Sequence, residues 1–230
     1  MIEQLESYML NNKNLLLFLK NEINNNKLDR KDNPNKNNVK RERFFYPKYK
    51  DTLFWCFYIL NNGFSEYEII GTHNFKKEKE MKFIYIEKIK ENKEKLKQFK
   101  LKKNEIIDNL LNDEFITIFT FHALCLCYNI NVLYIDNKKF FEILVDDNIK
   151  HIIHKINDSY CLEDFDDDKK NYYIKNYWRL ENLKKPIKSV SNYKVDELRD
   201  IATLISLTTT KENGKNKTKQ ELYDEIMKNI

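Results

Sequence analysis

The stretch INVLYIDNKKFFEIL, residues 130–144, indicates the fold class more directly than any other part of this chain. Two runs rich in β-branched and aromatic residues, 130–135 and 140–144, flank a polar segment at 136–139. Such runs on either side of a short polar turn predict a β-hairpin. The residues before it, 115–128, are apolar nearly all round, which is typical of a buried helix. The chain therefore changes from helix to strand just before the hairpin.

Working outward toward the N-terminus, the sequence predicts more helices. Residues 51–60 are apolar on nearly every side, with Asp51 or Thr52 as a helix cap and Asn62-Gly63 as the end. Residues 65–112 are dominated by Glu and Lys, with apolar residues every three or four positions. This pattern indicates surface helices that carry many spaced ion pairs.

Toward the C-terminus, residues 151–156 and 172–177 read as two further strands, separated by an acidic loop at 163–168. The loop lacks the glycine and the alternating ligands of a calcium loop, so a solvated turn is the better interpretation. Helices followed by a small antiparallel sheet predict an α+β body over residues 44–185.

The N-terminal residues read as an appendage to this body. Residues 1–23 predict an amphipathic helix that docks on the body or on a partner, or through which the chain self-associates. Residues 24–43 are almost all polar and predict a flexible basic linker. The first segment opens with acidic residues and is interrupted by asparagines, so neither a signal peptide nor a membrane span is expected.

The amino-acid composition limits the classes of function that this protein can have. The formal net charge of +5 is mildly basic, but a general preference for Lys, Asn and Ile could produce it without a polyanionic partner. The chain has three glycines, so a glycine-rich nucleotide-binding loop is effectively excluded. Its four cysteines form no CxxC pair, which favours a reducing compartment; we expect an intracellular protein, not secreted and not in a membrane.

No metal and no cofactor are expected. His122, Cys125 and Cys127 lie close together in sequence, but a helix does not bring all three onto one face. They are better explained as core residues of the helix at 115–128.

The last forty residues form a separate pattern. Residues 193–207 predict a helix whose apolar residues, at 195, 198, 201, 202 and 205, share one face. A polar loop containing Gly214 follows, and a second helix begins after Thr218, with Glu221 placed to complete a capping box. Two such helices would bury a small core between them, which defines a module at 190–230.

This order resembles the SAP domain, the helix-extended-loop-helix modules and the N-terminal domain of the transcription terminator Rho. The matching features are Leu-x-x-Ile-Ala in the first helix, a Gly-Lys loop and Lys-x-Glu-Leu-x-x-x-Ile in the second. The resemblance implies that Lys215, Lys217 and Lys219 face a phosphate backbone, with Arg199 and Lys194 as further contacts. The chain departs from the family pattern in carrying Ser206 where a glycine is common and in its longer loop.

The body resembles OTU and papain-like cysteine peptidases in having a buried helix near residue 51, then further helices, then a small sheet. In the OTU pattern Asp-x-x-Cys-Leu-Phe the nucleophile immediately precedes Leu-Phe, and that position here is Thr52. Cys56 lies one turn further into an apolar helix, where nothing would lower the pKa of its thiol. No histidine can be assigned as its base, so core packing is the simpler interpretation of Cys56.

These observations favour a non-enzymatic nucleic-acid-binding protein, with DNA as the expected partner of residues 190–230 and the body as an interaction or scaffold domain. The alternatives are a cysteine-peptidase-like enzyme or its inactive descendant, and a structural protein that self-associates through residues 1–23. Aromatic residues beside basic ones, as at 44–46 and 172–179, could also stack on single-stranded nucleic acid, although core packing is the better explanation of them. In style the chain resembles proteins of large nucleocytoplasmic DNA viruses, which would place it in the host nucleus, the cytoplasm or the virion.

Overall fold

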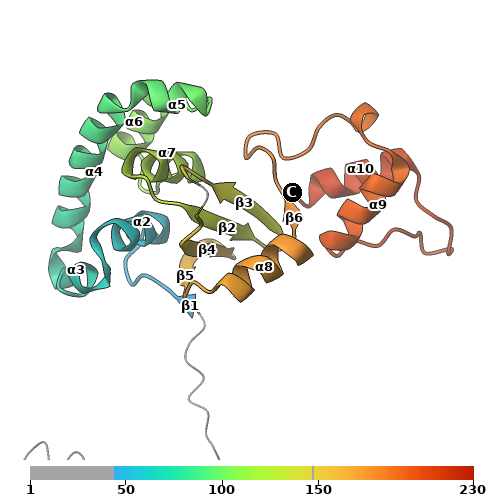
Figure 1. Cartoon of the computed structure of the whole chain (residues 1–230), viewed down its shortest axis with the longest axis horizontal. Helices are drawn as coiled ribbons and strands as arrows, with labels where there is room; N and C mark the ends of the chain where they lie inside the picture. Colours follow the sequence, from blue (N-terminus) through green and yellow to red (C-terminus); the bar gives the residue numbers. More distant parts are fainter. Residues whose placement is uncertain (1–43, 147) are drawn as a thin grey trace, which may run out of the picture. The chain divides into compact units, whose positions relative to one another are not determined.

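The computed structural model describes residues 44–146 and 148–230 (Figure 1). The helix expected at 1–23 and the linker expected at 24–43 lie outside the described residues. The described part has the predicted α+β fold, with most helices ahead of a six-stranded sheet and a pair of helices at the end of the chain.

Two buried helices, α2 (Thr52–Asn62) and α7 (Ile118–Tyr128), form the centre of the core, as predicted. The Asp51 carboxylate caps α2 by accepting a hydrogen bond from the Phe54 N–H at 3.1 Å. Gly63 ends the same helix with a φ of 92°, which costs glycine little because it has no Cβ. The two helices contact each other, and Figure 1 shows them beside the sheet.

The Glu- and Lys-rich segment is helical, as predicted, in several short pieces and one long helix. They are α3 (Phe64–Glu68), the 3-10 helix η2 (Gly71–His73), α4 (Asn74–Glu91), α5 (Lys93–Gln98) and α6 (Lys103–Asn112). Exposed ion pairs three residues apart occur along them, whereas Tyr85 and Ile89 of α4 are fully buried against α2 and α7. The regularly spaced apolar residues of this segment therefore include a buried face of α4.

The sheet contains two hairpins. Its strands are β1 (Phe44–Phe45), β2 (Val132–Asp136), β3 (Lys139–Ile143), β4 (His151–Ile156), β5 (Ser159–Glu163) and β6 (Trp178–Arg179). Their order across the sheet is β1-β5-β4-β2-β3-β6. The predicted hairpin is confirmed as β2–β3, and β4–β5 forms a second one. Each turn begins with an asparagine at positive φ, Asn137 and Asn157, as two-residue hairpin loops require.

The sheet is mixed, which corrects the expectation of an antiparallel one. Strands β2 and β4 pair in parallel, and so do β3 and β6. The connection from β3 to β4 has to pass the start of β2, where the buried Asn131 holds it. The Asn131 Oδ1 accepts from the Val145 N–H at 2.7 Å, and its Nδ2 donates to the Asn148 carbonyl at 2.7 Å. These long-range bonds leave no local sequence signal.

The strand expected at 172–177 is wrong, because residues 172–176 form the second half of helix α8 (Asp167–Asn176) and Tyr177 follows its end. Asp166 caps this helix by accepting from the Asp168 N–H at 3.0 Å, and two acids in the first turn suit its positive end. The supposed acidic loop is therefore a strand end followed by a helix start. Glu163, expected in a solvated turn, is buried on β5.

The two faces of the sheet belong to different clusters. Val132, Tyr134 and Ile153 pack with α2 and α7, whereas Leu133 and Ile152 pack with Tyr173 of α8. Successive side chains of a strand point to opposite faces, so both faces of β2 are covered. The near-continuous apolar run of β2 reflects this double burial.

The C-terminal residues form a separate apolar cluster around α9 (Val195–Leu204) and α10 (Lys219–Lys228), preceded by the 3-10 helix η3 (Val190–Asn192). Its buried members are Ile187, Leu198, Ile201, Ala202, Leu222 and Ile226. Trp178 of β6 packs against this cluster, and Lys139 Nζ donates to the carbonyls of Asn229 and Ile230 at 3.3 Å.

Candidate functional site

Thr52 and Cys56, the two candidate nucleophiles, both serve the packing of α2. Thr52 is the first residue of the helix, and its Oγ1 accepts a hydrogen bond from the Tyr160 N–H of β5 at 2.9 Å. Cys56 is fully buried, and burial raises the pKa of its thiol well above the ordinary value. A thiolate nucleophile needs the opposite shift.

The four histidines do not supply a base for either group. His73 lies at the exposed end of η2 and His151 at the start of β4. His122 is buried in α7, and desolvation lowers its pKa to about 4. His154 bonds through Nε2 to Glu163, at 2.8 Å, and the same carboxylate accepts from the Tyr173 hydroxyl at 2.8 Å. Across the described residues no histidine hydrogen bonds to Thr52 or Cys56.

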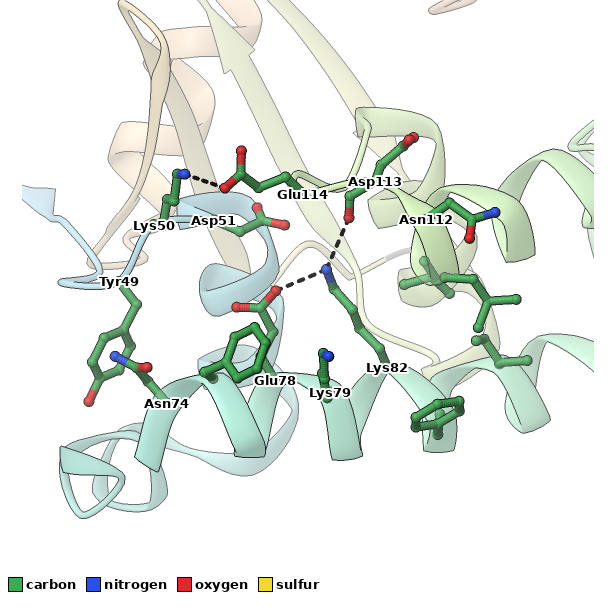
Figure 2. A pocket seen from close by; sticks show the side chains of 15 residues that line it. Tyr49, Lys50, Asp51, Asn74, Glu78, Lys79, Lys82, Asn112, Asp113 and Glu114 are labelled. Carbon is green, nitrogen blue, oxygen red and sulfur yellow. Dashed lines mark hydrogen bonds and ion pairs between the residues drawn. The ribbon is translucent and has the colours of Figure 1, made fainter. Parts of the chain in front are cut away.

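A groove of about 600 Å³ lies between α4, the end of α6 and the loop before α2 (Figure 2). Its lining combines charged and apolar side chains. Among the apolar ones, Phe75, Phe83 and Leu111 are 68%, 61% and 53% exposed. No sequence signal pointed to this groove, because three separate segments of the chain line it, at 49–51, 74–86 and 110–114.

Within this groove Asp51, Glu78 and Lys82 lie near one another, as Figure 2 shows. Lys82 Nζ lies 2.9 Å from the Glu78 carboxylate and 3.5 Å from the Asp113 carbonyl. Asp51 accepts from the Phe54 and Ile116 N–H groups, at 3.1 Å and 2.7 Å, so both of its oxygens are engaged.

Burial raises the pKa of Asp51 to about 6, although both backbone bonds and Lys82 lower it. The bond from the Ile116 N–H to Asp51 holds the start of α2 to the loop before α7, and the bond from Lys82 to Asp113 holds α4 to the end of α6. Each charged group of the cluster thus has a structural partner.

In the C-terminal module, the predicted lysines divide into two kinds. Lys217 Nζ donates to the Thr208 carbonyl at 2.7 Å and pairs with Glu225, which leaves its side chain only 14% exposed. Lys215 and Lys219 have no ion pair with any described residue. Lys217 therefore holds the loop, while Lys215 and Lys219 remain available to a ligand.

The two further expected contacts, Lys194 and Arg199, lie at the start of α9 and within it. Arg199 pairs with Asp196 at 2.8 Å, an exposed pair that competes only weakly with a ligand. The backbone N–H of Lys194 donates to Glu197, and its exposed side chain has no ion pair within the described part.

The capping box predicted at the start of α10 is confirmed. Thr218 Oγ1 accepts from the Glu221 N–H at 3.4 Å, and the Glu221 carboxylate accepts from the Thr218 N–H at 2.8 Å. Hydrogen bonds from Lys211 and Thr218 lower the pKa of Glu221 to about 2. A carboxylate of the chain itself thus occupies the anion-favouring end of this helix, so an incoming phosphate would have to bind beside it, at the loop lysines.

Comparisons with protein families, with characterised proteins and with solved structures found no significant match for this chain. Within residues 44–230, no helix is both long and apolar enough to cross a membrane. The same residues contain no group of three His, Cys, Asp or Glu side chains placed to hold a metal ion.

Proposed function

We propose that this chain is a non-enzymatic nucleic-acid-binding protein whose C-terminal module, residues 190–230, contacts the phosphate backbone, with DNA as the expected partner. The SAP-like resemblance of the module is part of this proposal. Lys215 and Lys219 are the principal contacts, and Lys194 is a third.

The proposal rests on a difference among the loop lysines: two of them pair with acidic residues and two do not. Lys211 pairs with Glu221 at 2.6 Å, and Lys217 with Glu225, so these two cations hold the loop against α10. Lys215 and Lys219 flank the held segment without an acidic partner among the described residues. A loop fixed before binding loses little conformational entropy when it binds, so its free cations attract phosphate at low cost.

The experiment is a salt series. Binding of the full chain to a DNA duplex is measured with the variant Lys215→Glu/Lys219→Glu and with a matched double reversal elsewhere, Lys76→Glu/Lys150→Glu. Each lost phosphate contact should reduce the slope of log K against log salt by roughly 0.9, hence by about 2 for the first variant. An unchanged slope in that variant, or an equal loss in the control, would reject the proposal.

A further inference from the structure

A basic hollow lies at the corner where α5 meets α6. It has a volume of about 550 Å³, and five lysines line it from three segments: Lys93 and Lys97 of α5, Lys100 of the turn, and Lys102 and Lys103 at the start of α6. Between residues 93 and 103 the chain has six lysines and one glutamate. The hollow keeps a net positive charge, although Glu94 pairs with Lys93 and Lys97, and Glu105 pairs with Lys102.

The start of α6 adds to this potential. Its N-cap is Lys102, a side chain that can donate but not accept, so it cannot cap the first-turn N–H groups. Unsatisfied N–H groups at a helix start carry partial positive charge. Glu105 in the same turn offsets part of it, and Lys184 lies 3.8 Å from that carboxylate.

An aromatic pocket of about 140 Å³ opens beside the hollow. Phe99, Phe119, His122 and Phe141 line it, together with residues 181–184. The His122 ring lies 5.9 Å from that of Phe99 and 5.5 Å from that of Phe141, both edge to face. Phe99 is 42% exposed, and desolvation keeps the nearby His122 neutral at pH 7 because its pKa falls to about 4.

The two cavities are adjacent, because Lys100 and Leu101 line both. We infer that this surface is a second nucleic-acid site, on the body, which binds a single strand with its phosphates over the α5–α6 lysines and a base in the aromatic pocket. The inference is independent of the module, since the two surfaces share no residue.

The combination of a lysine-rich surface with an aromatic pocket is what favours single-stranded nucleic acid as the ligand. A lysine-rich surface alone would attract any polyanion, and an aromatic pocket alone would suit any flat apolar group. Single-stranded nucleic acid alternates phosphates with unpaired aromatic bases, and proteins that hold it combine a basic track with stacking side chains. A duplex keeps its bases stacked inside, so it could use the lysines but not the pocket.

A substitution at Lys100 can weaken nucleic-acid binding without lowering the stability of the fold. Its φ of 56° is in the left-handed region, which disfavours residues with a Cβ, and the Leu101 N–H closes the turn onto the Leu96 carbonyl at 2.9 Å. Lys100→Gly should relieve this strain while it removes the cation at the junction of the two cavities. The variant should be at least as stable as the parent and should bind a single strand more weakly.

The test uses the full chain and a fluorescein-labelled oligothymidylate of roughly ten nucleotides, within the usual site size for such surfaces. Anisotropy across a salt series gives affinity and slope. Phe99→Ala should weaken binding roughly fivefold to a hundredfold, the range for loss of one stacked base. Lys93→Gln/Lys97→Gln should lower the salt slope by about 1.4, or roughly 0.7 per phosphate.

Matched controls lie away from this surface: Phe83→Ala for the ring and Lys76→Gln/Lys150→Gln for the charges, both on the body, and Ser206→Gly, in the C-terminal module, for relief of backbone strain. Phe99→Ala should leave duplex binding unchanged. Equal behaviour of Phe99→Ala and Phe83→Ala toward the oligothymidylate would overturn the base pocket, and parental affinity in Lys100→Gly would overturn the phosphate site. Failure of the module proposal would appear separately, as duplex binding that ignores Lys215 and Lys219.

Discussion

The Glu221 carboxylate reaches back over the first turn of α10 to accept a hydrogen bond from the Thr218 N–H at 2.8 Å, while the Thr218 hydroxyl accepts from Glu221. This reciprocal cap fixes where α10 starts and hence where Lys219 lies. Thr218→Ala should lower the free energy of unfolding by about 1 kcal/mol, the usual cost of losing an N-cap. Urea denaturation measures it, and Thr218→Ser should retain most of the stability. Equal loss in both variants would show that the hydroxyl does not act as a cap.

Ser206 closes the other helix of the module in a conformation that suits glycine. Its φ is 64°, and the Leu207 N–H donates to the Ala202 carbonyl at 2.7 Å, the long bond of a Schellman motif. Ser206→Gly should raise the free energy of unfolding by about 0.5–1 kcal/mol, because a left-handed residue with a Cβ is strained by slightly more than glycine loses in chain entropy. The same denaturation series checks it, and a destabilised variant would contradict the geometry.

Local chemistry made much of this fold predictable. The caps Asp51 and Thr218, the stop at Gly63 and the hairpin around Asn137 each lie within a few residues of the element they define. The register of Leu198, Ile201 and Ala202 likewise followed from their spacing. Signals of this kind need no knowledge of distant residues.

Long-range arrangements were not predictable. The aromatic run 172–177 suits a strand by composition, whereas the cap at Asp166 and the acidic first turn favour a helix. The parallel pairing of β2 with β4 depends on the passage of the chain past Asn131. In the same way, Lys100 and Phe141 line one pocket although they are distant in sequence. The lysine-rich run 93–103 was visible in the sequence, but its aromatic neighbour was not.

Removal of the Asn131 side chain tests the crossover directly. Asn131→Ala would remove the side-chain partner of the half-buried Val145 N–H and of the Asn148 carbonyl. A hydrogen bond of this kind contributes about 0.5–1.5 kcal/mol net, so the variant should lose roughly 1–3 kcal/mol of unfolding free energy. Asn176→Ala, which removes one exposed bond to the Tyr172 carbonyl, should change stability by less than about 0.5 kcal/mol. Similar losses in the two variants would refute the role given to Asn131.

The cysteines distinguish the binding protein from the peptidase alternative. All four are buried and free, and burial raises the pKa of Cys127 and Cys161 to about 11 and the pKa values of Cys56 and Cys125 well above the ordinary value. The native protein should therefore react slowly with Ellman's reagent at neutral pH, and four thiols should appear after denaturation. One thiol that reacts at once in the native state would revive the enzyme hypothesis. A Cys56→Ala variant would then show whether that thiol is Cys56.

His122 should make the protein sensitive to acid. Its pKa is about 4 in the folded chain, below the ordinary value of 6.5, because burial disfavours the imidazolium. The unfolded chain therefore binds more protons between these values, so this contribution to stability is complete above 6.5 and is lost as the pH falls toward 4. Between about pH 7.5 and about pH 5 the loss amounts to roughly 2 kcal/mol.

Replacement of the imidazole by a ring that cannot titrate separates the effect of His122 from that of other groups. Asp51, with a pKa of about 6, changes the stability in the opposite direction as the pH falls. An acid with a raised pKa gains relative stability as the pH falls from 6 toward 3.8, and that gain is common to parent and variant. His122→Phe should thus lose about 2 kcal/mol less than the parent between the two pH values, measured by urea denaturation at each. His73→Gln, at an exposed position, should behave like the parent. If His122→Phe and the parent lose the same stability, the imidazole is already charged or hydrated in the native state, and the neutral aromatic pocket beside Lys100 would have to be abandoned with it.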